Sequence, residues 1–397
     1  MWRHFAANAL TLLIVGLIAA AGIVAWAQSQ YRGDGPLAEA ICLRVQSGSN
    51  MRRVADELSE RGAITNASIF RLGAEYSGKS DQLKAGSFLI REGASMEEVV
   101  DAITRGGRST CGTEVVLRIG VATQEIEVRQ LDPETERFAV VAEFDPAAEA
   151  AAEDYIAVRD MDDTRFRVSL AEGVTSWQVV EAINRADFLS GEVPAIPAEG
   201  TLAPESYEVA AGADRSALLA QMAELQADRL AEAWANRAEG LPFDTPEEAL
   251  IMASIIEKET ALPEERPTVS SVFKNRLERG MRLQTDPTVI YGVTEGRGVL
   301  GRGLRQSELR GATPWNTYVI DGLPPTPIAN PGLLSIEAAL NPLETDYVFF
   351  VADGTGGHAF ATNLADHNAN VARWREIERE RERAAQEAGE DAGESDQ

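Results

Sequence analysis

The sequence predicts an α+β protein that is held in a membrane by one N-terminal helix. Three observations support this class: an uncharged N-terminal run, alternating apolar and polar residues in mid-chain, and capped helical segments on either side of them. A chain of 397 residues is too long for one core, so several domains are expected. The formal charge of −26 argues against nucleic acid as a partner, because phosphates require a basic face.

The N-terminal run comprises residues 6–27, which carry no charged side chain. As a helix, these 22 residues extend about 33 Å, enough to cross the hydrocarbon core of a bilayer. A cleaved signal peptide is the alternative, because residues 25–27 have the small-x-small pattern of a cleavage site. We favour a retained transmembrane helix, since a signal core has only about 7–15 apolar residues. Arg3 then places residues 1–5 in the cytoplasm and the bulk of the chain outside.

Residues 41–111 are expected to form a small module of strands and helices. One of its helices should begin at Ser95, because Glu98 completes a capping box three residues later. The only cysteines, Cys42 and Cys111, bracket this module. Outside the membrane a disulfide between them would persist, and the chain-entropy relation gives it about 4 kcal/mol of stabilisation. A bridge and two free thiols both stay open, because the sequence does not fix the distance between the Cα atoms.

Residues 112–163 contain three segments in which apolar and polar residues alternate, at 114–121, 124–131 and 137–144. This period of two predicts half-buried β-strands. We therefore expect a β-rich insertion ahead of a larger domain at residues 165–375. The role of the insertion does not follow from its residues.

The larger domain is organised around residues 245–263, which predict a buried helix. Thr245 and Glu248 have the spacing of a capping box at its start. The eight residues 249–256 include only one polar side chain. Because a helix that is apolar on all sides lies inside a protein, and eight residues cannot span a bilayer, this segment is expected in the core.

Two carboxylates, Glu257 and Glu259, fall in the last turn of this helix. The partial negative charge of the helix end, partial burial and the neighbouring carboxylate each raise a carboxyl pKa. A raised pKa suits a proton donor at neutral pH. The alternative is that both side chains lie on the exposed side of a fraying helix end, paired with Lys258 or Arg266.

A second group of polar side chains follows in the chain. Gln284, Thr285 and Asp286 precede the strand-like residues Val289–Tyr291, which end in an aromatic ring. Saccharides need hydrogen-bond donors, acceptors and an aromatic face, so this segment is a candidate sugar cradle. A plain Asp-Pro turn is the alternative.

The C-terminal part offers no metal-ligand pattern. His358 and His367 lie near each other in sequence, but their spacing supplies no third ligand, so no metal site is predicted. Residues 376–397 are charged and end in an acidic stretch. They are too polar to bury, and we expect this tail to be disordered.

Six motifs, in this order along the chain, resemble the endolytic murein transglycosylase family. They are ASIIEKET (253–260), NRL (275–277), GMRLQTDPTVIYG (280–292), NTY (316–318), GLPP (322–325) and FVADGTGGHAFATNLADHN (350–368). The resemblance covers residues 165–375, with a looser match over 41–108. It implies a LysM-like module, a fold associated with glycan binding, and a mixed α+β, lysozyme-like catalytic domain.

The resemblance implies cleavage within nascent peptidoglycan strands, between N-acetylmuramic acid and N-acetylglucosamine, to give 1,6-anhydro ends. One Glu of the EKET run is the acid/base in that family. The run is also similar to the helix end of lysozyme-like lytic transglycosylases, which aligns Glu259 with their catalytic Glu, and Glu257 is the alternative. The resemblance makes the following residues candidates for substrate contact: Glu257, Gln284, Thr285, Asp286, Tyr291, Asn316, Tyr318, His358 and Asn363.

Two other functions fit the same residues. A hydrolase would use Glu259 as acid with Glu257 or Asp286 as base. A non-enzymatic scaffold would bind glycan through residues 41–111 without shortening it. The resemblance implies no cofactor, glycan strands as the substrate, cell-wall synthases as further candidate partners, and a single-pass protein of the inner membrane whose bulk is periplasmic.

Overall fold

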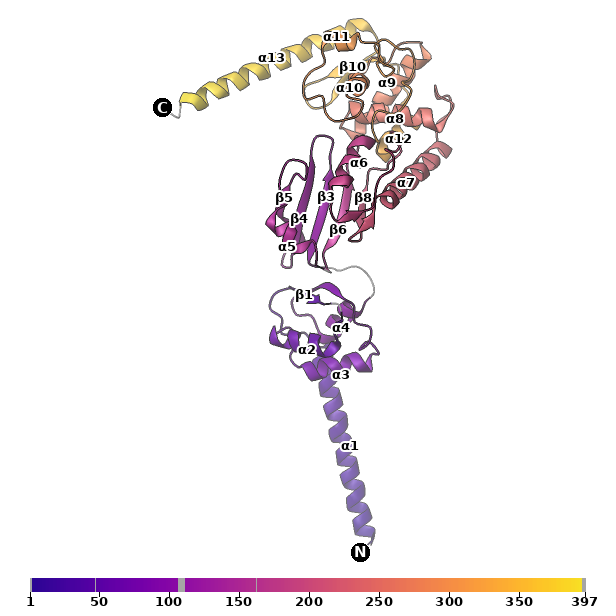
Figure 1. The fold of residues 1–397 in the computed structure, drawn as a ribbon. Helices are drawn as coiled ribbons and strands as arrows, with labels where there is room; N and C mark the ends of the chain where they lie inside the picture. The colour runs from indigo at the N-terminus through magenta and orange to yellow at the C-terminus, as the bar shows by residue number, and fades with distance from the viewer. Residues whose placement is uncertain (1, 47, 106–110, 162, 395–397) are drawn as a thin grey trace. The chain divides into compact units, whose positions relative to one another are not determined.

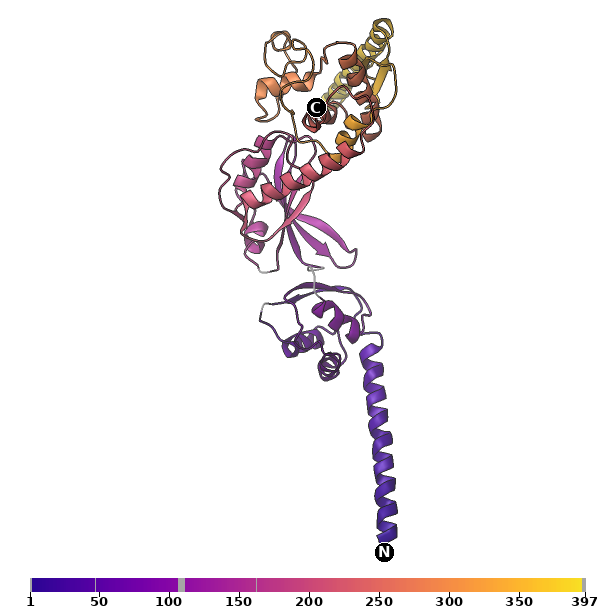
Figure 2. The same cartoon turned by 90° about the vertical axis from the view of Figure 1, so that its right-hand side faces the viewer.

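The computed structural model describes residues 2–46, 48–105, 111–161 and 163–394; within its first and last helices, side chains are described from residue 10 and up to residue 383. The chain divides into two compact units. One comprises residues 1–116, 126–144 and 149–167, and the other comprises residues 117–125, 145–148 and 168–397. Figures 1 and 2 show the elements of both units from two directions.

The first element, α1 (Trp2–Arg32), is an unbroken apolar helix. Among the described residues it is the one helix long and apolar enough to cross a membrane; its most apolar 18 residues have a mean hydropathy of 2.4, and none of them is buried. An exposed apolar helix of this length is compatible with a single-pass anchor. The helix continues past residue 27, where the apolar run ends.

The module after α1 contains a two-stranded antiparallel sheet and three helices. Its elements are β1 (Ile41–Val45), α2 (Met51–Glu60), α3 (Ala67–Tyr76), β2 (Gly86–Ile90) and α4 (Met96–Thr104). Its core consists of apolar side chains from all five elements, including Leu43, Leu58, Phe70, Ile90 and Val99. Ser95 caps α4 in a capping box with Glu98, as the sequence predicts. Cys42 and Cys111 are joined in a disulfide, with their Cα atoms 5.7 Å apart.

A five-stranded sheet follows, in the order β5-β4-β3-β6-β8. The strands are β3 (Thr113–Ile119), β4 (Gln124–Asp132), β5 (Arg137–Phe144), β6 (Arg165–Leu170) and β8 (Ser206–Val209). The three alternating segments of the sequence are therefore strands, but they do not form a separate sheet. Side chains on both faces of β3 are buried, which requires packing against both faces of the sheet; within the sheet, β3 lies between β4 and β6. The short helix α5 (Glu153–Val158) follows β5, and Tyr155 packs on Phe144.

The helical part of the second unit is built around one buried helix. Its elements are α6 (Ser176–Arg185), β7 (Leu189–Ser190) parallel to β9 (Ala213–Asp214), α7 (Arg215–Ala235), α8 (Pro246–Glu259), the 3-10 turn η1 (Pro263–Glu265), α9 (Arg266–Glu278), α10 (Asp286–Thr294), α11 (Gln306–Leu309), α12 (Leu333–Leu340), the hairpin of β10 (Phe349–Ala352) and β11 (His358–Ala361), and α13 (Leu364–Glu394). Residues 249–256 of α8 are all buried, and α7, α9, α10 and α12 pack on this helix. The prediction of a buried helix over this stretch is confirmed.

Two expectations about secondary structure are wrong. Val289–Tyr291 lies in α10 and not in a strand, because Pro287 starts a helix in which Thr288 and Val289 face the core. The charged tail, expected to be disordered over residues 376–397, is helical as far as Glu394, and residues 395–397 lie outside the described residues. Its run of Arg, Glu and Ala residues has a high helix propensity, which decides the backbone conformation although the tail has little apolar surface to bury.

Candidate active site

Glu259 is the last residue of α8. Its position depends on where the helix begins and on how the helix is packed. Thr245 accepts a hydrogen bond from the Glu248 amide at 3.2 Å, while the Glu248 carboxylate accepts one from the Thr245 amide at 3.3 Å. This capping box sets where α8 begins, and the buried residues 249–256 prevent the helix from rotating. The carboxyl group of Glu259 is thus held by the core of its own domain.

The environment of Glu259 favours the protonated acid. Burial is the largest cause and raises its pKa to about 7, and the negative charge of Asp286 adds to the rise. The hydroxyl of Thr285, which donates a hydrogen bond to Oε1 of Glu259, has the opposite effect. Electrostatic interactions with His358 and Arg276 also favour the carboxylate, by smaller amounts. The group can therefore both donate and accept a proton near neutral pH.

Thr285 is positioned by the strained segment in front of α10. Gln284 has a φ of 50°, an uncommon left-handed conformation for a residue with a side chain. Its amide donates to the Thr317 carbonyl at 3.2 Å, and the Thr285 amide donates to the Thr317 hydroxyl at 3.0 Å. The result is a buried Thr285 beside Glu259 and an exposed Gln284 side chain.

Tyr318 and Asp286 form a hydrogen-bonded pair near Glu259. The Tyr318 hydroxyl donates to Oδ1 of Asp286 at 2.6 Å, and burial together with that carboxylate raises the pKa of the phenol. Asn316 accepts a hydrogen bond from the Tyr318 amide at 2.9 Å and donates to the Gly311 carbonyl at 2.7 Å. Because the side chain of Asn316 has no exposed surface, it can support this pair but is not open to a ligand.

His358, the first residue of β11, is held by Glu265. The two carboxylate oxygens of Glu265 contact the His358 amide and the ring Nδ1, each at 2.8 Å. Thr260, the residue after Glu259, donates its hydroxyl to Glu265 at 3.3 Å. Gly357 leaves room for this arrangement, since a Cβ there would lie 2.6 Å from Oε1 of Glu265. Sequence analysis did not single out Glu265, because it lies in a short acidic run typical of a solvated loop.

Arg276, from the NRL motif, connects α9 to the segments that carry the site. Its buried guanidinium donates to the carbonyls of Val348 and Leu283 at 2.7 and 2.6 Å. The neighbouring Asn275 donates to the carbonyl of Tyr347 at 2.9 Å. One motif thus ties the start of the hairpin and the loop before Thr285 to the same helix.

Glu257 has a different environment from Glu259. Its Oε1 pairs with Nη2 of Arg266 at 3.1 Å, both side chains being 5% exposed, and its Oε2 accepts from the Gly332 amide at 3.0 Å. Gly332 is the N-cap of α12, so Glu257 joins the ends of two helices. Burial nevertheless raises its pKa. The exposed, fraying helix end considered from the sequence is wrong for Glu257, because this side chain lies in the interior.

Two further candidates have partners of their own. Tyr291 donates its hydroxyl to Glu199 at 3.1 Å and packs edge-on against Trp315 at 5.4 Å. Asn363 accepts from the Asp366 amide at 3.0 Å and thus caps the start of α13. The structure brings together Glu259, Thr285, Asp286, Tyr318 and His358. Glu257, Tyr291 and Asn363 instead contact Arg266, Glu199 and Asp366, respectively.

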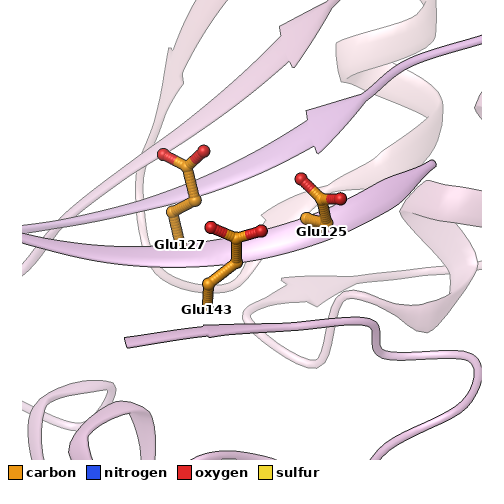
Figure 3. Close-up of side chains that lie close together, drawn as sticks. All are labelled: Glu125, Glu127 and Glu143. Atoms are coloured by element: carbon orange, nitrogen blue, oxygen red, sulfur yellow. The ribbon is translucent and has the colours of Figure 1, made fainter. Parts of the chain in front are cut away.

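A separate group of three carboxylates lies on β4 and β5 (Figure 3). Glu125, Glu127 and Glu143 each offer an oxygen within 4.8 Å of the others. Glu127 and Glu143 are direct cross-strand partners, which explains their proximity. Glu127 is buried and accepts a hydrogen bond from Arg129 at 2.6 Å. Acidic groups of this kind are common without a bound ion, and this one supports no metal site.

The site therefore consists of the carboxyl group of Glu259, with a pKa raised to about 7, at the end of a buried helix and beside the polar side chains of Thr285, Asp286, Tyr318 and His358. Residues 43–373 match the YceG-like family, and the chain belongs to that family. The matched range includes residues 112–163, which the sequence analysis had set apart as an insertion.

The chain is 28% identical over 339 residues to an endolytic murein transglycosylase of Streptococcus pneumoniae strain D39, a match covering 84% of this chain and 58% of the relative. It is 27% identical over 326 residues to an endolytic murein transglycosylase of Bacillus subtilis, covering 82% of each. The chain thus spans little more than half the length of the pneumococcal protein. A crystal structure of a yceG-like protein from Listeria monocytogenes is 25% identical and covers 84% of this chain and 99% of its own; its TM-score is 0.45.

Proposed function

We propose that this protein is a membrane-anchored endolytic transglycosylase that cleaves within peptidoglycan strands. The observation that carries the proposal is Glu259, a carboxylic acid with a pKa of about 7 at the end of a buried helix. The family and the names of the two relatives give the substrate class. A lytic transglycosylase needs one such group, because no water has to be activated.

The reaction uses Glu259 twice. The protonated carboxyl group donates its proton to the glycosidic oxygen as the bond from C1 of N-acetylmuramic acid breaks, and the N-acetylglucosamine side leaves with a hydroxyl group. The muramyl 6-oxygen then bonds to C1, and its proton passes to the Glu259 carboxylate. The product is a 1,6-anhydro ring, and the enzyme returns to its starting protonation state. A pKa near the working pH suits both steps.

The neighbouring side chains have supporting roles in this proposal. Thr285 orients the carboxyl group, while Tyr318 with Asp286 and His358 with Glu265 offer hydrogen-bonding groups to the sugars. The exposed side chain of Gln284 is a further contact to substrate. The reaction requires no metal or nucleotide.

The hydrolase remains the second candidate because of one observation. Asp286 is exposed and its charge acts on Glu259, so it is the carboxylate available to activate a water. Glu257 is the poorer base, since it is buried and ion-paired with Arg266. The two reactions differ in their products by one water.

The cellular setting is part of the proposal. We place α1 across the inner membrane, with residues 1–5 in the cytoplasm and the bulk of the chain in the periplasm. The order strand, helix, helix, strand in the small module supports the LysM-like assignment, and this module would hold a glycan strand. Enzymes of cell-wall synthesis are then the expected neighbours, because nascent strands are the substrate.

The test compares three forms of the full-length protein in detergent: wild type, Glu259→Gln, and Glu264→Gln as a control in an exposed Glu nearby. Each is incubated with uncrosslinked glycan strands, and the new ends are analysed by mass spectrometry. Loss of the general acid should lower turnover at least about 100-fold in the first variant, while the control keeps its activity.

The products decide among the candidates. Anhydromuramyl ends that disappear with Glu259→Gln support the transglycosylase. Ends heavier by one water, lost also with Asp286→Asn, establish the hydrolase instead. Glycan that is bound but not shortened by a folded wild-type protein identifies a scaffold and rejects both enzymes. A Glu257→Gln variant that abolishes turnover while Glu259→Gln keeps it transfers the acid role to Glu257.

A further inference from the structure

We propose that α3 lies in the interfacial region of the membrane, beside the point where α1 leaves it. The chain would then have two contacts with the bilayer, a spanning helix and a surface helix. This inference rests on the single-pass anchor proposed above. It concerns lipid as the partner of one exposed helix face.

The last turns of α1 pack directly on α3. Gly73 of α3 lies so close to the ring of Tyr31 that a Cβ at residue 73 would be 2.1 Å from Cε2 of that ring. Tyr31 and Ile69 also pack against the core of the module. Both helices belong to the same compact unit, so the module is fixed to the end of the anchor without an intervening linker.

The outer face of α3 exposes two large apolar side chains beside the polar Ser68 and Glu75. Phe70 and Ala74 are fully buried and attach the helix to the core. Leu72 and Tyr76, four residues apart and therefore on one face, are 61% and 90% exposed. This side of a surface helix is normally polar, so Leu72 and Tyr76 are its unusual members and Ser68 and Glu75 its ordinary ones.

The position of this face identifies lipid as the occupant. Single exposed apolar residues are normal on any protein surface, so Leu72 and Tyr76 alone would prove nothing. Here the helix that carries them is packed on α1, whose exposed residues include Trp26 at 56%. Trp and Tyr are the side chains enriched at membrane–water interfaces. An amphipathic helix in such a place inserts its apolar face about 5–10 Å into the boundary between headgroups and acyl chains.

The test measures the depth of single nitroxide labels on the full-length protein in nanodiscs of phosphatidylethanolamine and phosphatidylglycerol. The labels are attached at Leu72→Cys and Tyr76→Cys, with the native disulfide intact. Leu17→Cys, in the middle of α1, serves as the membrane control, and Ser59→Cys, exposed near the end of α2, as the water control. Relaxation by oxygen and by a water-soluble nickel chelate gives the depth of each label.

We expect the labels at 72 and 76 to lie about 5–10 Å below the phosphates, between the two controls. If the labels at 72 and 76 are as accessible to water as the label at Ser59, while the label at Leu17 is deep, the inference about α3 is wrong and the transmembrane anchor is retained. A shallow label at Leu17 instead removes the anchor and the inference with it. Circular dichroism of each labelled protein confirms that the module is folded.

Discussion

Replacing Thr285 by Val tests whether the hydroxyl beside Glu259 sets its acidity. The two side chains have nearly the same shape, so the change removes one hydrogen-bond donor from the carboxylate and little else. That hydrogen bond lowers the pKa of Glu259 against the effect of burial. Its loss should therefore raise the pKa above the value of about 7 in the native protein.

The size of the shift follows from the strength of the bond. A hydrogen bond to a charged group contributes about 1.5–3 kcal/mol, and one pKa unit corresponds to about 1.4 kcal/mol. The pKa of Glu259 should thus rise by about 1–2 units in the variant. Since the free enzyme must carry the protonated acid, kcat/KM falls as pH rises through this pKa, and the fall should move to higher pH by the same amount.

The assay is the pH dependence of kcat/KM for release of glycan ends between pH 5 and 10. Thr294→Val, which removes a hydroxyl bonded only to a carbonyl of its own helix at 3.0 Å, is the matched control and should leave the profile in place. The absolute rate can fall in the Thr285 variant because the carboxyl group is less well oriented. An alkaline limb that stays where it is, or moves to lower pH, would refute the reasoning.

Two further substitutions separate structure from chemistry. Arg266→Met leaves Glu257 buried without its cation, so the free energy of unfolding should fall by about 3–5 kcal/mol, and a loss under 1 kcal/mol in denaturant titration would contradict the buried ion pair. Gly357→Ala pushes the flexible end of Glu265 away from His358, so kcat should fall while the melting temperature changes little; unchanged kcat would show that this pair is dispensable.

The elements with local signals could be predicted from the sequence. The capping boxes at Thr245 and Ser95 gave the starts of two helices, and the alternating segments gave three strands. The pairing of these strands could not be predicted, because β3 pairs with β6, a strand far away in the sequence, and no local pattern marks that partner. Val289 was misjudged because three β-branched or aromatic residues are too short a run to outweigh a proline at a helix start.

In the candidate site, too, some features have a local sequence signal and others depend on residues far away in the chain. The pKa expected for Glu259 follows from burial of α8, which is visible in the apolar run before it. The roles of Glu257 and Asn316 are not visible in the sequence, because each depends on a partner that the fold brings near. Glu257 contacts Gly332, and Asn316 contacts Gly311. Glu265 carries no local signal at all, and its contact with His358 joins residues 93 positions apart.

The contact of Glu257 with the first turn of α12 has a consequence for how the protein loses activity. Residues 257 and 259 point about 200° apart on a helix. The contacts of Glu257 with Gly332 and Arg266 therefore hold the last turn of α8, and this turn carries Glu259. Glu257 is also paired with Arg266, and α12 packs on α8 through buried side chains, so the end of α8 can unwind only together with this part of the core. Heat inactivation should therefore coincide with unfolding of the domain and not precede it.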